Sequence, residues 1–167
     1  MPKQISDERI ALVLLDTPPA DPDNITVAEF DAGTHLECRI MDYRLSPVAS
    51  DTVQMGELCT ATNAQVPTRS NYEGTVTVFR YLDSDGLADS SNDVAWDAFK
   101  EKGTTLHLVE REGPDHDAAG AAGQEYSYFE VITDHPQQPT DRGGFIRREV
   151  PLYVQRAAIN KEMDAGS

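Results

Sequence analysis

Apolar and polar residues alternate along several stretches of the chain, which is typical of a strand with one buried face. From Thr34 to Leu45, the residues Leu36, Cys38 and Ile40 occupy every second position. The same period of two recurs in four later stretches, at residues 75–82, 104–112, 127–134 and 145–154. Together with the apolar run Ile10–Leu15, the pattern predicts one mostly β domain over residues 1–167, a β-sandwich or β-barrel.

The alternation also assigns side chains to the polar faces of these strands. His107 and Arg111 alternate with the leucines of residues 104–112, so both are expected to point away from the core. Arg147 is likewise expected on a polar face. The apolar set opposite it consists of Ile146, Val150, Leu152 and Val154.

One stretch breaks the strand pattern and predicts a helix at about residues 91–102 that flanks the β-layer. Ser90 or Ser91 stands where an N-cap is expected, and two lysines lie in the last turn, where cations favour the helix dipole. Gly103 follows the last turn, as is common at helix ends. The residues expected to be buried are Val94, Ala95, Ala98 and Phe99, with Trp96 beside them.

Three segments lack a regular period and are expected to have no core of their own. The longest, residues 46–74, is predicted to be a loop far longer than is usual within a compact domain. An N-terminal arm lies within residues 1–33 together with the first strand, and residues 157–167 form a C-terminal tail. We expect these segments to become ordered against neighbouring subunits.

The chain carries 14 basic and 29 acidic residues, a formal net charge of −15. Because this charge repels phosphate groups, tight binding to nucleic acid is not expected. The segment from Arg142 onward is mildly positive, with five basic and three acidic residues. No apolar run approaches the roughly 20 residues that span a bilayer, so membrane insertion is not expected. The N-terminal residues also lack the pattern of an export signal.

Residues that often carry chemistry are present but form no recognisable site. Asp83–Gly86 begins like a calcium-binding loop without its closing glutamate, and Ala118–Gly123 lacks the lysine of a phosphate loop, so both are predicted to be turns. Cys38 and Cys59 are expected to be buried, reduced thiols. The histidines are scattered without metal-ligand spacing: His35, His107, His116 and His135. We therefore expect no enzyme, no cofactor and no metal site.

Four stretches form a recognisable combination, and they run in order over residues 44–53, 70–83, 94–113 and 121–155. Their most distinctive parts are a helix followed by Gly-Thr-Thr and a strand, a loop of the form Asp-x-Pro-Gln-x-Pro-x-Asp-Arg, and a closing strand with Val-Pro-Leu. The combination resembles the major tail tube proteins of long-tailed (siphovirus-type) bacteriophages, in particular those that infect actinobacteria.

The resemblance implies a structural virion protein that assembles in the host cytoplasm into hexameric rings. The rings would stack into a tail tube, and genomic DNA would pass through its channel without specific binding. The implied partners are other copies of the chain, the tape measure protein, the tail terminator and the distal tail or baseplate proteins. An alternative is another β-sandwich virion protein, either a tail terminator or a capsid-decorating protein. A small enzyme or carbohydrate-binding module would need clustered aromatic residues or a metal.

The basic final segment supplies candidates for contacts between subunits. Guanidinium groups are planar and donate paired hydrogen bonds to carboxylates, which are abundant elsewhere in the chain. Complementary contact between copies is therefore available without another partner. The candidate residues are Arg142, Arg147, Arg148 and Arg156.

Overall fold

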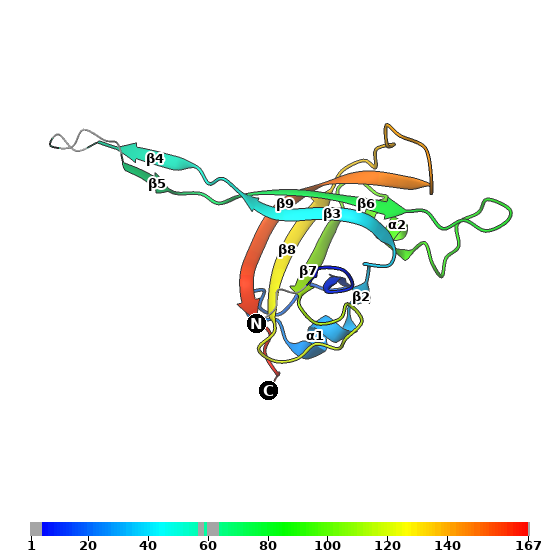
Figure 1. Cartoon of the computed structure of the whole chain (residues 1–167), viewed down its shortest axis with the longest axis horizontal. Coiled ribbons are helices and arrows are strands. Elements are labelled where there is room, and N and C mark those ends of the chain that lie inside the picture. The colour runs from blue at the N-terminus through cyan, green and yellow to red at the C-terminus, as the bar shows by residue number, and fades with distance from the viewer. Residues whose placement is uncertain (1–4, 57–58, 60–63, 167) are drawn as a thin grey trace.

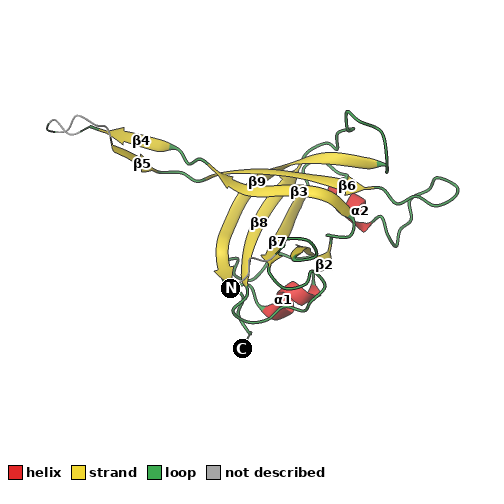
Figure 2. Ribbon diagram, viewed as in Figure 1, coloured by secondary structure: helices red, strands yellow, loops and turns green. Residues whose placement is uncertain are grey.

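The computed structural model describes residues 5–56, 59 and 64–166. Its main element is a seven-stranded antiparallel sheet that curls into a half-barrel (Figures 1 and 2). The strand order is β2-β1-β7-β8-β9-β6-β3. These strands are β1 (Ile10–Leu15), β2 (Thr34–His35), β3 (Ile40–Val48), β6 (Asn71–Phe79), β7 (Thr105–Glu112), β8 (Glu125–Thr133) and β9 (Arg147–Glu162), and the helices are α1 (Val27–Ala32) and α2 (Val94–Phe99). The prediction of a mostly β fold is confirmed.

Strands β1, β7 and β8 are buried on both faces. Because successive side chains of a strand point to opposite faces, Leu12 and Leu14 enter one core while Val13 and Leu15 enter another. The first core lies inside the curl of the sheet and includes side chains of α2, and the second core includes α1. Burial on both faces explains why Ile10–Leu15 is a continuous apolar run, and the strand predicted there has these bounds.

The alternation predicted the inner face of the later strands correctly in most positions. Four inward side chains on β6 and β9 are at most 3% exposed: Val76, Val78, Val150 and Leu152. Ile146 is an exception, because it precedes β9 in a loop and is 52% exposed. Cys38 lies in the turn before β3 as an exposed free thiol, and Cys59 is also exposed. The expectation of two buried thiols is therefore wrong.

Arg111 contradicts the polar face that was predicted for β7, because it is only 1% exposed. Its guanidinium donates hydrogen bonds of 2.8 Å to the carbonyl oxygens of Asp115 and Ala118, and it lies 4.9 Å from the centre of the Phe30 ring. Burial lowers the pKa of Arg111. The prediction is wrong because α1 and the β7–β8 connection form a second layer over this face.

Helix α2 is shorter than the predicted range of residues 91–102. The Asp93 carboxylate precedes the helix but does not cap it, because it accepts hydrogen bonds from Arg80 Nε at 3.1 Å and from the Tyr81 amide at 2.9 Å. The two serines predicted as N-cap residues lie before Asp93 in a turn. Phe99 is 0% exposed, as predicted for the buried stripe.

The N-terminal arm contains a helix, α1, that was not predicted. Thr26 and Glu29 form a capping box, in which the Thr26 hydroxyl accepts from the Glu29 amide and the Glu29 carboxylate accepts from the Thr26 amide. Ile25 and Phe30 are both 0% exposed in the second core. The Tyr126 hydroxyl accepts a hydrogen bond from the Ile25 amide and donates one to a carbonyl of the arm. The expectation that this arm lacks a core is therefore wrong.

The predicted C-terminal tail is also part of the half-barrel. Strand β9 continues to Glu162, and Ala158 and Met163 are only 4% and 3% exposed. Register shifts interrupt the pairing of β9 with β8, so apolar residues no longer fall at every second position. The expectation of an unpacked tail at residues 157–167 is wrong for residues 157–166, and residue 167 lies outside the described residues.

The described residues of the range 46–74 form the ends of β3 and β6 and an arm of two paired strands, rather than the predicted loop. The arm consists of β4 (Thr52–Met55) and β5 (Ala64–Pro67), and it continues from the ends of β3 and β6. Figure 1 shows it reaching away from the half-barrel, and every residue of both strands is exposed. Strands of four residues are too short to be recognised by their period, which explains the error.

We predict that Phe99→Ala destabilises the monomer by about 3–5 kcal/mol, because the ring is fully buried and its removal leaves a cavity. Urea unfolding followed by tryptophan fluorescence measures the change. Leu87→Ala, at a position that is 66% exposed, is the control and should change stability by less than about 0.5 kcal/mol. A loss below about 1 kcal/mol for Phe99→Ala would contradict the packing described here.

Candidate assembly surfaces

One face of β3, β6 and the first half of β9 is left uncovered by the described part of the chain. The register places Asp42, Thr77 and Glu149 side by side on this face, while the alternate residues point into the first core. We call it the open face. Its side chains are exposed or half-buried and mostly polar: Asp42, Arg44, Ser46, Glu73, Thr75, Thr77, Glu149 and Tyr153.

Acidic groups outnumber basic ones on the open face. Arg44 forms an ion pair with Glu73 between β3 and β6. Asp42 and Glu149 form no ion pair with the residues that the structure describes. At the edge of the face, hydrogen bonds from the His135 amide and the Tyr153 hydroxyl lower the pKa of Asp134. The face therefore presents negative charge to solvent.

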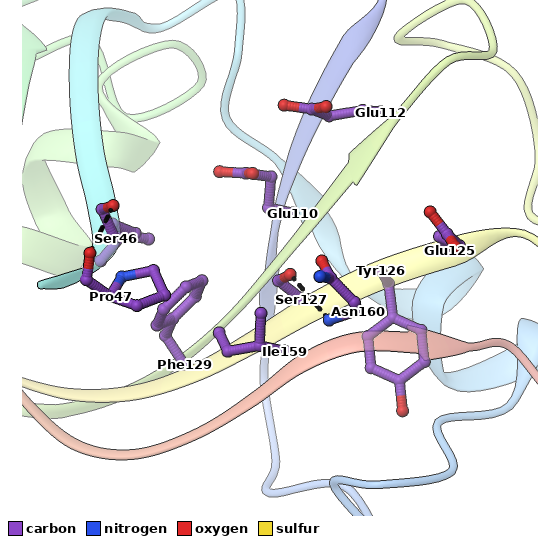
Figure 3. Close-up of a pocket in the computed structure, with 11 residues that line it drawn as sticks. Ser46, Pro47, Glu110, Glu112, Glu125, Tyr126, Ser127, Phe129, Ile159 and Asn160 are labelled. Carbon is purple, nitrogen blue, oxygen red and sulfur yellow. Dashed lines mark hydrogen bonds between the residues drawn. The ribbon is translucent and has the colours of Figure 1, made fainter. Parts of the chain in front are cut away.

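A groove of about 360 Å³ opens at the seam between β3 and the strands β7, β8 and β9 (Figure 3). Apolar side chains line it together with Glu110, Glu112 and Glu125. Burial raises the pKa of the Glu110 carboxyl, while its hydrogen bond with Tyr43 lowers that pKa and the charge of Glu112 raises it. Burial also raises the pKa of Tyr43, and the nearby charge of Glu110 adds to this effect.

The hairpin arm has one apolar side. Val53 lies directly opposite Val66 in the register, and Met55 lies opposite Ala64, so these four side chains share one side of the ribbon. Val53, Met55 and Val66 are 51%, 64% and 49% exposed. We call this side the arm face. The alternate residues of the two strands lie on the other side of the ribbon: Thr52, Gln54, Gln65 and Pro67.

A second apolar surface lies at the end of β6 that is distant from the arm (Figure 1). It is a groove of about 410 Å³ that we call the loop-end groove. Phe145 is 81% exposed there, and its ring packs edge-on against Phe79 with 5.9 Å between the ring centroids. The residues that line the groove are Phe79, Arg80, Tyr81, Leu82 and Phe145.

The structure does not bring the four candidate arginines into one site. Arg147 donates hydrogen bonds to the carbonyl oxygens of Gly143 at 2.8 Å and Asp141 at 3.1 Å, so it holds a loop of its own subunit. Arg148 donates to the Arg147 carbonyl at 2.8 Å.

The other two arginines are more accessible. Arg156 lies 3.9 Å from the carboxylate of Asp23, and both side chains are 54% exposed. Arg142 is exposed and makes no hydrogen bond or ion pair with the described residues. Arg142 is therefore the arginine that is most available to a neighbouring subunit.

Two histidines meet at one carboxylate, which their positions in the sequence did not suggest. The Nδ1 atoms of His35 and His116 lie 2.8 Å and 3.4 Å from Glu37 Oε1. Within the described ranges, no group of three or more His, Cys, Asp or Glu side chains is arranged to hold a metal ion. The same ranges contain no helix that is both long and apolar enough to cross a membrane.

We predict that Glu110→Gln stabilises the monomer at neutral pH by about 1 kcal/mol or less. The pKa of Glu110 is higher in the folded state than in the unfolded state. The protonated side chain therefore contributes stability at a pH below the unfolded-state pKa, and this contribution is lost as the pH rises through the folded-state pKa. Urea unfolding from about pH 4 to pH 8 should therefore give a flatter stability profile for Glu110→Gln. The exposed Glu162→Gln is the control, and an unchanged slope for Glu110→Gln would contradict the prediction.

Comparisons with known proteins agree with the fold. The sequence model of the phage tail tube protein family matches residues 1–163. No curated protein matches the chain. The SPP1 tail tube, solved by solid-state NMR and cryo EM, is similar with a TM-score of 0.58 and 11% identity over 97% of this chain and 82% of that chain. The six-fold symmetrised cryo-EM structure of the anti-feeding prophage baseplate contains a chain with a TM-score of 0.54 and 10% identity, covering 94% of this chain and 95% of that one.

The two structural likenesses concern the fold, because both identities are low. The family match is different in kind, since it extends over nearly the whole sequence. The protein with this half-barrel, arm and open face is therefore a structural component of the virion. The chain belongs to the phage tail tube protein family.

Proposed function

We propose that six copies of the chain form a ring, and that rings stack into a tube whose channel is lined by the open face. The observation that carries the proposal is that β3, β6 and the first half of β9 are packed on one side and polar on the other. A channel wall requires this arrangement, because one face packs on the core while the other meets water.

The strand edges support association in a ring. Strand β3 is at one edge of the sheet, and the two-residue strand β2 covers little of β1 at the other edge. Backbone groups of an edge strand that are unpaired in the monomer are available for pairing with another chain. One chain of the anti-feeding prophage baseplate has a similar fold, and that baseplate structure is six-fold symmetrised. This supports a ring of six copies.

The proposal assigns no catalytic residue and no cofactor to the chain. Its further partners would be those that the family resemblance implies: the tape measure protein, the tail terminator and the distal tail or baseplate proteins. Electron microscopy of the purified protein tests the proposal. Tubes with a central channel are expected, whereas monomers alone would contradict it, and single rings would favour a tail terminator.

We predict that Asp42→Lys combined with Glu149→Lys makes assembled tubes bind DNA. The open face of the native protein carries unpaired carboxylates, which repel phosphates and let DNA slide. Each ring of six would change by about 24 charge units, and the resulting affinity should fall steeply with salt. Binding of short DNA to tubes is measured by co-sedimentation. Asp7→Lys combined with Asp16→Lys, at exposed positions off the open face, should leave DNA unbound, and equal binding by both variants would refute the assignment of the face.

We also predict that Arg142→Glu lowers the yield of tubes several-fold at low salt and less at high salt. Charge reversal opposes attraction to the acidic surface of a neighbour, and salt screens that interaction. Arg142 is a cleaner choice than Arg147, which holds its own loop. Lys100→Glu is the control, because Lys100 directly follows α2 and pairs with Asp97 of that helix in its own subunit. Normal tubes from Arg142→Glu at low salt would mean that Arg142 is simply solvated.

A further inference from the structure

One basic side chain interrupts the acidic open face. Among the described side chains of that face, Arg44 is the one cation, beside the carboxylates of Asp42, Glu73 and Glu149. Arg147 begins β9 at the edge of the face, but its guanidinium is bound to carbonyl oxygens of its own loop. The Arg44 side chain is 67% exposed. A guanidinium keeps its charge and donates paired hydrogen bonds to phosphate oxygens, so Arg44 is the group on this wall that is suited to bind DNA.

The strand register gives Arg44 a fixed position between acidic groups. Arg44 lies opposite Thr75, and the row that contains Asp42 and Glu149 is two residues further along the strands. Two residues of a strand span about 7 Å. Glu73 is two residues from Thr75 in the other direction, diagonally across from Arg44. Long side chains can reach one another at such diagonal positions of neighbouring strands.

Glu73 is the carboxylate that pairs with this cation. The ion pair joins Arg44 Nε to Glu73 Oε1 between β3 and β6. Glu73 Oε1 is shielded from solvent, although 42% of the Glu73 side chain is exposed. Because β3 and β6 are paired on both sides of this position, the carboxylate stays beside the guanidinium at a high effective concentration. A phosphate group must therefore displace Glu73 before it can bind Arg44.

Free arginines on the wall would hold DNA even though the face is acidic overall. Six copies in a ring would place six Arg44 guanidiniums around the channel. Each phosphate that a cation neutralises releases counterions, and several such contacts give strong binding at low salt. Coulomb energy falls with distance, so a group in direct contact with Arg44 has more effect on it than carboxylates about 7 Å away. Net acidity alone does not make this wall inert.

We infer that Glu73 masks Arg44 from DNA phosphates, so that the ion pair keeps the channel wall from holding the DNA that passes. This inference rests on the proposed tube, in which the open face lines the channel. Each partner has a role in the pair. Arg44 offsets the repulsion among the carboxylates of the face and joins the edge strand β3 to β6, while Glu73 prevents Arg44 from binding phosphate.

Two variants of equal net charge separate masking from acidity. Glu73→Gln removes one negative charge from each copy and frees Arg44, whereas Asp42→Asn removes one negative charge and leaves the ion pair in place. At about 50 mM salt, Glu73→Gln tubes should retain at least about 10-fold more short linear DNA than native tubes in co-sedimentation, and should release it by about 200 mM salt. Asp42→Asn tubes should behave as native tubes do. Equal retention by the two variants, or no retention by Glu73→Gln tubes, would overturn the inference.

Two further variants identify the group that binds the DNA. Arg44→Gln combined with Glu73→Gln has the native net charge but no guanidinium on the face, so its tubes should leave DNA unbound. Thr75→Glu combined with Glu73→Gln places a carboxylate directly opposite Arg44 and should also abolish retention. If the variant without Arg44 retains as much DNA as Glu73→Gln alone, Arg44 is not the binding group and the inference fails.

Closed circular DNA distinguishes the inference from the proposed function. A circle has no end that can enter a channel, so Glu73→Gln tubes should retain linear DNA and leave circles unbound. Equal retention of circles would place Arg44 on the outside of the tube. That result would contradict the proposed channel wall, whereas masking of Arg44 by Glu73 would stand.

NMR of the monomer tests the masking without tubes. Inorganic phosphate should leave the Arg44 Nε–H signal of the native chain unchanged and should shift it in Glu73→Gln. Arg142 is the internal reference, because it is exposed and its signal should respond in both chains. Equal responses of Arg44 in the two chains would overturn the inference. Failure of the native chain to form tubes would instead refute the proposed function.

Discussion

The architecture depends on unequal covering of one continuous sheet. Side chains alternate between the two faces of every strand, so each strand must have a partner layer on a face or leave that face to water. The strands next to α1 have layers on both sides, and the run Ile10–Leu15 can therefore be apolar throughout. Strands β3 and β6 and the first half of β9 have a layer on one side only, which leaves a polar wall available for a channel.

Much of this arrangement could be predicted from the sequence where alternation is regular. The inward residues of β6 and the first half of β9 followed the period of two, and the bounds of β1 were correct. The errors have physical causes. Arg111 is polar yet buried because its guanidinium finds carbonyl oxygens in a layer that no local pattern indicates. Register shifts concealed the end of β9. Helix α1 was missed because six residues are too few to show a helical period.

The assembly surfaces were harder to predict than the core. The basic charge of the final segment indicated four arginines, but it could not indicate that Arg147 is occupied within its own subunit. The arm face was detectable in principle, because Val53 and Met55 are two residues apart and Val66 and Ala64 repeat that spacing. The loop-end groove was not, since Phe79 and Phe145 are brought together only when β9 pairs with β6.

The position of β9 has a consequence for the timing of folding. This strand is the last of the sheet in the sequence, yet it lies between β8 and β6 and joins the two halves of the half-barrel. During synthesis, β3 and β6 can form a hairpin and β1, β7 and β8 can pair, but the two groups remain separate until β9 has left the ribosome. The polar wall and the loop-end groove thus come into existence together, in the final step of folding. A nascent chain is therefore unable to join a growing polymer before its own fold is complete.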